Sequence, residues 1–162
     1  MKKKLLIWIP VPLLIIVLIT VNWNYISQYT EWKLNWEIGI PRPTKIETVF
    51  HTRNGFPSEG EVFHVLHYKS IEKKLEDKDG WISINEDSFD TVSGHLKKFQ
   101  KDVANINKDT QQFNMLFQEN PVTFEEEDKY FYKLEEDNSY ILAISNAKEM
   151  RSQALAQKFK NA

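Results

Sequence analysis

The stretch YFYKLEEDNSYILAI, residues 130–144, holds two runs of β-forming residues around a polar centre. Tyr130–Leu134 and Tyr140–Ile144 are rich in aromatic and branched side chains, which are favoured in strands. The residues between them, Glu135–Ser139, are all polar, as expected for the turn of a hairpin. This stretch predicts an antiparallel hairpin, and the other elements of the domain are interpreted around it.

A second hairpin is predicted earlier in the chain. Thr44–Thr52 and Glu61–Tyr68 have the composition of strands, and the segment between them, Arg53–Gly60, contains Gly, Pro and Asn, which favour turns. Trp81–Ile84 is interpreted as a short strand or an apolar anchor. The charged segment Ser70–Asp77 is interpreted as a short helix.

Helices are predicted between and after the hairpins. Residues 87–107 carry apolar side chains at alternating spacings of three and four, with Asp87 or Ser88 as the N-cap. A second helix begins at Asp109 and ends at Asn120-Pro121, and a third is predicted from Asn146 to about Lys160. The apolar stripe of the first helix consists of Phe89, Val92, Leu96, Phe99, Val103 and Ile106.

The fold class that follows is α+β: an antiparallel-sheet domain of two hairpins with packed helices, preceded by an N-terminal transmembrane helix. A doubly wound parallel sheet is not expected, because no parallel crossover pattern is present. The predicted domain organisation is an anchor and its extension at 1–36, a linker at 37–43 and the α+β domain at 44–162.

The membrane anchor is predicted from a run of 17 uncharged, mostly apolar residues, Leu5–Val21. The next charged residue is Glu31, and about 20 apolar residues in a helix cross the hydrocarbon core, so the span is placed at about 5–26. Lys2–Lys4 precede the run, which predicts a cytoplasmic N-terminus and an extracellular C-terminal domain on a single-pass signal anchor in the cell membrane. The alternative is a cleaved signal peptide, although no Ala-x-Ala-like site follows Val21.

Aromatic residues after the span are candidates for the membrane interface, where Trp and Tyr gather. Tyr25, Tyr29, Trp32 and Trp36 are spaced to lie on one helical face, and Trp23 immediately follows the span. The alternative is that this stripe packs on the domain itself. The interface candidates are Trp23, Tyr25, Tyr29 and Trp32.

The amino-acid composition limits the kinds of partner and chemistry that are expected. Of the 21 basic residues three are Lys2–Lys4, and the remaining 18 stand against 23 acidic residues, so the rest of the chain carries a net charge of −5. Nucleic-acid binding needs a basic face and is not expected. The sequence has no cysteine, which excludes a disulfide framework, a thiolate metal site and a cysteine nucleophile.

Binding candidates come from the first hairpin. The loop Arg53–Gly60 is long for a hairpin and carries Arg53, Phe56 and Glu59, whereas the alternative for Phe56 is a cap on the core. His51 and His64 lie on partner strands and could face each other, but two imidazoles without a carboxylate make a poor zinc site. His64 and His67 point to opposite faces of a strand, so they cannot share a metal.

Catalytic and metal motifs are weak. Asp77, Asp79 and Glu86 match three positions of a calcium loop, but Leu75 stands where the first carboxylate is needed. No nucleophile elbow, phosphate loop or metalloprotease helix is present, and no cofactor is expected. A hydrolase that uses a carboxylate pair is kept as the alternative function.

A resemblance rests on the anchor, Ile40-Pro41-Arg42-Pro43, Ile46-Glu47, Gly55-Phe56 and Glu59-Gly60-Glu61. Over about the first 70 residues, the chain resembles small uncharacterised membrane-anchored proteins of Gram-positive bacteria. The resemblance implies a location and a type of organism, and no activity. The expected function is non-enzymatic: the extracytoplasmic domain binds an envelope protein, in a regulatory or immunity-type role, with the lipid bilayer holding the anchor.

Overall fold

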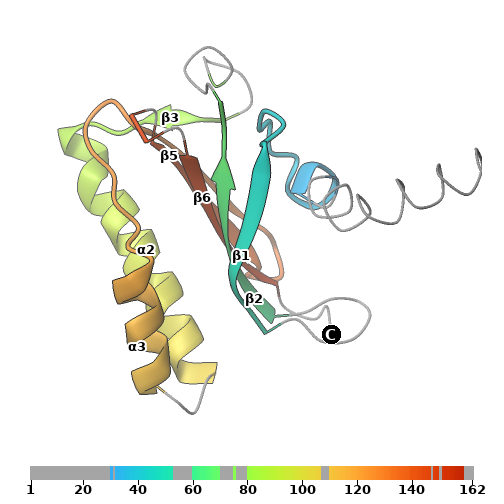
Figure 1. Ribbon diagram of the computed structural model, residues 1–162, viewed down its shortest axis with the longest axis vertical. Helices are drawn as coiled ribbons and strands as arrows, with labels where there is room; N and C mark the ends of the chain where they lie inside the picture. The colour runs from blue at the N-terminus through green and yellow to red at the C-terminus, as the bar shows by residue number, and fades with distance from the viewer. Residues whose placement is uncertain are drawn as a thin grey trace, which may run out of the picture. The chain divides into compact units, whose positions relative to one another are not determined.

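The computed structural model describes residues 30, 32–52, 60–69, 75, 80–106, 110–146, 148–149 and 151–158. The chain divides into two compact units, Met1–Glu37 and Ile38–Ala162. In the first unit, residues 32–36 are helical and carry the buried side chains of Trp32 and Trp36. The second unit contains a β-sheet and two helices (Figure 1).

The sheet of the second unit has six strands, and all its neighbouring pairs are antiparallel. Its spatial order is β1-β2-β6-β5-β4-β3, so the last strand lies in the middle, between β2 and β5. The α+β class and the antiparallel sheet predicted from the sequence are confirmed. The strands are β1 (Lys45–His51), β2 (Gly60–His67), β3 (Ile82–Ser83), β4 (Lys129–Leu134), β5 (Tyr140–Asn146) and β6 (Arg151–Lys158).

The prediction of a helix from Asn146 to Lys160 is wrong, because Arg151–Lys158 forms strand β6. Ala, Leu, Gln, Arg and Lys are good helix formers, and they dominate the segment. In the fold, however, the segment bonds to β2 on one side and to β5 on the other. Pairing on both edges outweighs a local preference of a few tenths of a kcal/mol per residue.

The turn before β6 explains why the sequence resembled a helix start. The side-chain oxygen of Asn146 accepts a hydrogen bond of 2.9 Å from the backbone N–H of Glu149. The same bond would cap a helix, but here it closes the connection between β5 and β6. A capping pattern in sequence therefore identifies the local bond and does not identify the element that follows it.

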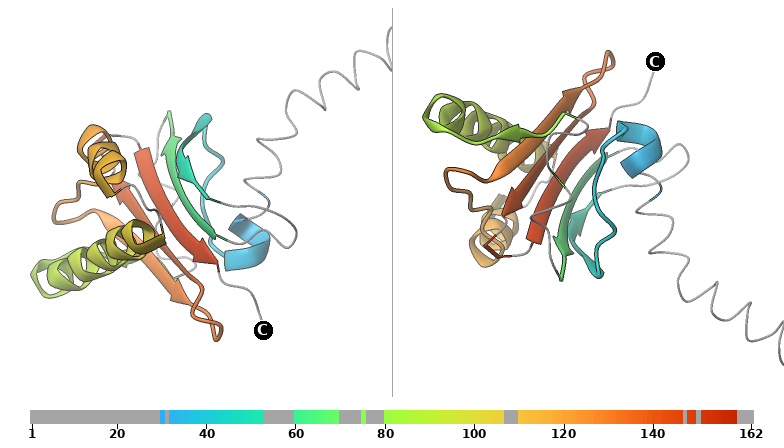
Figure 2. Two further views of the ribbon diagram at one scale, coloured as in Figure 1. Left: turned by 90° about the horizontal axis from the view of Figure 1, so that it is seen from below. Right: turned by 90° about the horizontal axis from the view of Figure 1, so that it is seen from above.

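Helices α2 (Glu86–Ile106) and α3 (Thr110–Glu119) lie on the same face of the sheet (Figure 2). Their bounds are within a few residues of those predicted. The N-cap of α2 is Asn85, instead of Asp87 or Ser88: Asn85 N–H donates to Ser88 Oγ at 2.9 Å, and Ser88 N–H donates to Asn85 Oδ1 at 3.0 Å. This reciprocal pair satisfies donors that the first helical turn leaves unpaired.

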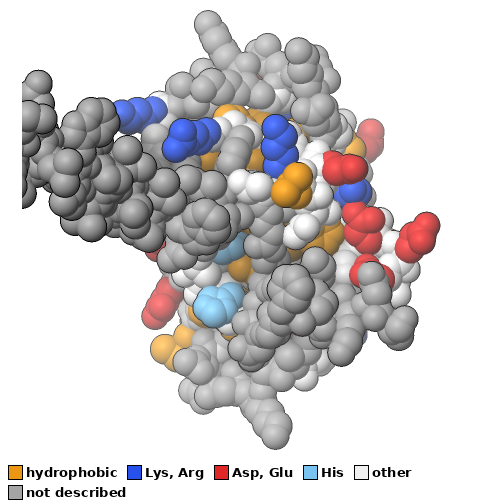
Figure 3. Space-filling view, turned by 90° about the vertical axis from the view of Figure 1, so that its right-hand side faces the viewer, with side chains coloured by type: hydrophobic (Ala, Val, Ile, Leu, Met, Phe, Trp, Pro, Cys, Tyr) orange, Lys and Arg blue, Asp and Glu red, His pale blue; other side chains and the backbone are white. Residues whose placement is uncertain are grey.

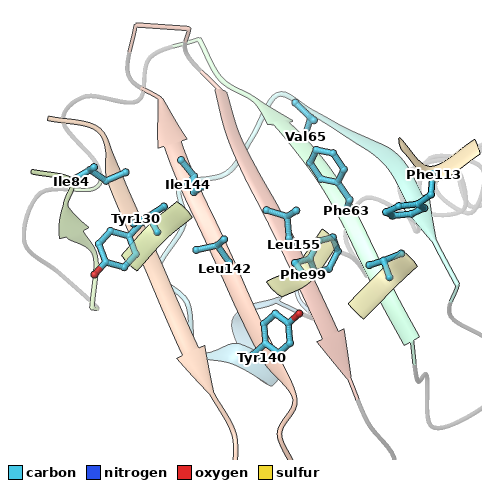
Figure 4. Packing of buried hydrophobic residues seen from close by; sticks show 12 residues of the cluster. Phe63, Val65, Ile84, Phe99, Phe113, Tyr130, Tyr140, Leu142, Ile144 and Leu155 are labelled. Carbon is cyan, nitrogen blue, oxygen red and sulfur yellow. The ribbon is translucent and has the colours of Figure 1, made fainter. Parts of the chain in front are cut away.

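The main core fills the space between the helices and the sheet (Figure 4). From α2 it takes Val92, Phe99 and Val103, three members of the stripe predicted from the sequence, each 0% exposed. Phe89, another member, is 41% exposed. The remaining buried members of the cluster are Phe63, Val65, Ile84, Phe113, Tyr130, Tyr140, Leu142, Ile144 and Leu155.

The second face of the sheet, away from the helices, carries buried side chains on its two central strands, which are small except for Ile141. Their neighbours on β4 include Phe131, whose register partner is Ala143. The segment Ile38–Pro43 runs over this face on its way into β1 (Figure 2), and its Ile38 and Ile40 are buried. The small side chains are Ala143, Ser145, Ser152, Ala154 and Ala156.

Several predictions fall on residues outside the described ranges: the span 5–26, Trp23, Tyr25 and Tyr29 at the interface, the loop residues Arg53, Phe56 and Glu59, and Asp77 and Asp79. Within the described ranges, no helix has the length and apolar character needed to cross a membrane. The linker predicted at 37–43 belongs, from Ile38 onward, to the second unit.

Candidate functional site

The first candidate site from the sequence, the pair His51 and His64, is not formed as a facing pair. In the register of β1 on β2, His51 lies opposite Val62, two residues from His64 along the strand, and the one-residue bulge between Thr48 and Phe50 does not bring the two histidines opposite each other. His64 lies opposite Thr48, whose hydroxyl is 3.1 Å from His64 Nδ1. Histidine side chains are visible on the side of the molecule away from α2 and α3 (Figure 3).

The two histidines also differ in environment. His64 is 4% exposed, whereas His51 is exposed on the edge strand. His64 is therefore a buried histidine next to the Thr48 hydroxyl, whereas His51 faces solvent. Among the described residues, no group of three or more His, Asp and Glu side chains could hold a metal ion.

Of the residues named for the predicted calcium loop, the structure describes only Leu75 and Glu86, at its first and last positions. Leu75, at the position of the first ligand, is buried, and its carbonyl accepts a hydrogen bond of 2.9 Å from Lys129 Nζ. Glu86 is exposed in the first turn of α2. The side chain of Leu75 is thus buried and offers no carboxylate at the first position of the loop.

A cluster of titratable side chains lies between α2 and the β4–β5 hairpin; we call it the α2 cluster. His95, Lys98 and Asp102 follow one another on α2 at spacings of three and four, so they share a helical face. Tyr132 of β4 and Tyr140 of β5 complete the cluster from the sheet. None of these five residues was among the candidate site residues of the sequence analysis, although the spacing of the three α2 residues was visible in the sequence.

Asp102 is the acceptor at the centre of the α2 cluster. Its Oδ2 accepts hydrogen bonds from the Tyr140 hydroxyl at 2.9 Å and from Lys98 Nζ at 2.6 Å. Lys98 Nζ also lies 4.0 Å from the centre of the Tyr140 ring. These contacts among the aspartate, the lysine and the tyrosine therefore attach α2 to β5.

His95 extends the α2 cluster toward the edge of the sheet. Its ring stacks on Tyr132, with centroids 3.6 Å apart and planes 12° apart. Burial and the nearby charge of Lys98 lower the pKa of His95 below its usual range. The imidazole is consequently neutral at pH 7 and acts as a flat ring in the stack.

The tyrosines of the α2 cluster are held in their neutral form. Burial raises the pKa of Tyr140 far above its usual range, and the hydrogen bond and charge of Asp102 act in the same direction. Burial and Asp102 also raise the pKa of Tyr132. A tyrosinate in either position is disfavoured, so the cluster favours fixed hydrogen bonding over proton transfer near pH 7.

Two further carboxylates are buried, and each accepts a hydrogen bond from a nearby residue. Glu61 accepts one from the Thr52 hydroxyl, and its own N–H donates to Thr52 Oγ1 at 2.9 Å. Asp128 Oδ2 accepts one from Glu125 N–H at 2.8 Å. These bonds give both carboxylates a local structural role at the ends of strands.

Comparison of the chain with family models, with curated proteins and with solved structures finds no match.

The bond between Tyr140 and Asp102 can be tested by Tyr140→Phe. Loss of a buried hydrogen bond to a charged acceptor should lower the free energy of unfolding by about 1 to 2 kcal/mol at pH 7. Because the folded-state pKa is raised, the wild-type contribution is complete below the unfolded pKa of about 10 and is lost as pH rises above it. Urea unfolding at pH 7 to 11 should show a shallower alkaline loss in the variant.

The matched control is Tyr132→Phe, which removes a hydroxyl from the neighbouring tyrosine and keeps the ring that stacks on His95. We expect a smaller loss at pH 7 than for Tyr140→Phe. Equal losses in the two variants would contradict the role assigned to the bond with Asp102.

Proposed function

We propose that the protein is a single-pass membrane protein whose extracytoplasmic α+β domain binds a protein partner in the cell envelope. The observation that carries the proposal is the uncharged run that begins at Leu5, follows Lys2–Lys4 and ends before Glu31. The resemblance to anchored proteins of Gram-positive bacteria supports the same location. The role is regulatory or of the immunity type, and the domain contacts no nucleic acid.

The chemistry of the domain supports binding over catalysis. In the α2 cluster the aspartate is hydrogen-bonded to the lysine and to the tyrosine, and Glu61 is hydrogen-bonded to Thr52. A catalytic carboxylate pair requires one group to be available as acid or base beside a substrate. The observed bonds occupy these groups with structural partners.

Exposed apolar side chains provide the domain with a surface that a partner can cover. Met115 on α3 is 52% exposed, and Leu134 at the end of β4 is 55% exposed. The ring of Phe89, at the start of α2, packs against that of Phe124 with centroids 4.9 Å apart, and part of the Phe89 side chain remains exposed to solvent. Large apolar side chains of this kind supply much of the energy of protein interfaces when a partner removes them from water.

Crosslinking in intact cells tests the binding. A photo-reactive amino acid placed at Met115, Leu134 or Phe89 should yield an adduct with one defined envelope protein from at least one position. Glu47, exposed on edge strand β1, is the control position and should give less adduct. No specific adduct from any of the three positions would contradict the proposed binding role.

Localisation is tested separately by fractionation and mass. The chain should appear in the membrane fraction with its full mass of 19.2 kDa, and protease added outside the cell should reach the domain. A mass reduced by the leader would favour a cleaved signal peptide. Intact chain in the soluble cytosolic fraction would overturn the membrane anchor.

A further inference from the structure

We propose that β1 pairs with the β1 strand of a second copy of the chain, so that two sheets join edge to edge in a symmetric dimer. The pairing is antiparallel and centred on Ile46, and it places Lys45 of each copy opposite Glu47 of the other. The second copy is a partner in addition to the envelope protein of the proposed function, and it binds at a different part of the domain.

The outer edge of β1 is where the second copy binds. β1 is at one end of the sheet, and of the described strands it pairs only with β2 (Figure 2). An edge strand presents backbone N–H and C=O groups away from its own sheet, and these groups can pair with a strand of another chain. All side chains of β1 are exposed or partly exposed. A second strand can therefore approach β1 along its length.

Two side chains of opposite charge lie on one face of β1. Lys45 Nζ is 2.8 Å from Glu47 Oε2, and the two side chains are 65% and 46% exposed. Glu47 lies opposite Val65, a member of the main core, so both charges are on the helix-facing side of the sheet. The hydrogen bond from Lys45 lowers the pKa of Glu47, and the carboxylate is therefore charged at pH 7.

These charges select one register for the dimer. Directly opposite residues of a strand pair share a face, so a symmetric pair of identical strands has one residue opposite itself. With Lys45 or Glu47 at that position, like charges face each other, which is unfavourable. With Ile46 there, Lys45 lies opposite Glu47 of the second copy, twice in the dimer, and the four charges alternate in sign. The two Ile46 side chains meet on the other face.

The bulge in β1 disfavours a register centred further along the strand. The pairing of β1 with β2 is regular from Lys45 to Thr48, and the register shifts immediately after Thr48. A pairing centred on Ile46 uses Thr44–Thr48 and ends before the bulge. A pairing centred on Thr48 would run through the bulge, where the ladder of hydrogen bonds is interrupted.

The charge pattern also explains why a lysine at this edge is compatible with pairing. Lysine on an edge strand usually discourages pairing with another chain. Here the carboxylate of Glu47 from the second copy lies opposite Lys45 and offsets its charge. A ladder over Thr44–Thr48 is short, so the dimer belongs to the weak class of interfaces that bury less than about 1,200 Å².

Disulfide trapping of the full-length protein, purified in detergent micelles, tests the register. The chain contains no cysteine, so Ile46→Cys introduces a single thiol at the centre of the proposed pairing. Opposite Cα atoms of an antiparallel pair are about 4.5 to 5.5 Å apart, a separation that a disulfide bridges. Mild oxidation should therefore convert Ile46→Cys into a covalent dimer of twice the mass.

The matched control is Thr48→Cys, two residues along the same strand. In the proposed register, Thr48 of one copy is four residues away from Thr48 of the other, which is about 13 Å along the strands. A disulfide cannot bridge Cα atoms more than about 7 Å apart, so Thr48→Cys should give about tenfold less dimer.

Charge reversal tests the contact between Lys45 and Glu47. In the Ile46→Cys background, Lys45→Glu or Glu47→Lys turns both cross-strand pairs into like charges and should lower the dimer yield about tenfold. A tagged chain with one reversal, mixed with an untagged chain with the other, should recover the yield, because the reversed side chains then face opposite charges. Both variants change exposed side chains and should keep the wild-type circular dichroism.

Three results overturn the proposal: equal dimer from Ile46→Cys and Thr48→Cys, a yield unaffected by charge reversal, or a yield that mixing does not recover. The crosslinks to an envelope protein from α2, α3 and β4 do not depend on these outcomes, so failure of the proposed function would be recognised separately. A photo-reactive residue at Glu47 should crosslink to a second copy of the chain, which its mass identifies.

Discussion

Replacement of Ala154 by proline is expected to destabilise the domain severely. Ala154 lies in the middle of β6, opposite His64 of β2 and Ala143 of β5. Proline has no N–H to donate to the ladder, which leaves a buried carbonyl without its donor at a cost of about 1 to 3 kcal/mol, and its ring adds a steric cost because it does not fit a central strand. Domains of this size are stable by only about 5 to 15 kcal/mol, so a large share of the stability should be lost.

The control for this variant is Glu136→Pro in the β4–β5 turn. Asn138 N–H donates to the Glu135 carbonyl at 3.0 Å, and Asn138 has a φ of 64°. Glu136 is thus the second residue of a turn, the position at which proline is favoured. Thermal and urea unfolding should separate the two variants, and a cooperative wild-type-like transition for Ala154→Pro would show that β6 is not a central strand.

Phe99→Ala should produce the second-largest loss. Phe99 is fully buried and contacts the rings of Phe117 and Tyr140 edge-to-face, at centroid distances of 6.3 and 6.5 Å. Truncation of a buried phenylalanine leaves a cavity and costs about 3 to 5 kcal/mol. Urea unfolding followed by far-ultraviolet circular dichroism measures the change in the free energy of unfolding.

Phe89→Ala is the matched control, because Phe89 belongs to the same helix and to the same apolar stripe in the sequence. It is 41% exposed and packs against Phe124 at a tilted angle, so its truncation should cost about 0.5 to 1.5 kcal/mol. Similar losses for the two phenylalanines would contradict the packing of α2 described above.

Much of the fold was predictable from local patterns. The spacing of Val92, Phe99 and Val103 predicted both the helix and its buried face. The polar segment between Leu134 and Tyr140 predicted the β4–β5 hairpin, which the register confirms. Because these features depend on residues that are close together in the sequence, local sequence patterns are sufficient to predict them.

The candidate site was less predictable. His51 and His64 were placed on partner strands, which is correct, but the register of the two strands puts His51 opposite Val62 and His64 opposite Thr48. The α2 cluster combines three α2 residues with Tyr132 and Tyr140, which come from a later hairpin. Such combinations depend on how the helix docks on the sheet, and docking leaves no pattern of its own in the sequence.

The sequence by itself determined the uncharged run at the N-terminus, the amphipathic helix at 86–106 and the two hairpins. Only the tertiary structure decided that Arg151–Lys158 is a strand and that Ile38–Pro43 crosses the sheet. The physical reason is that both segments are weakly specified by their own residues. β6 acquires its conformation from backbone partners on two distant strands, and Ile38–Pro43 is held by a hydrogen bond to the Gly39 carbonyl from Trp81, which lies about forty residues later in the chain.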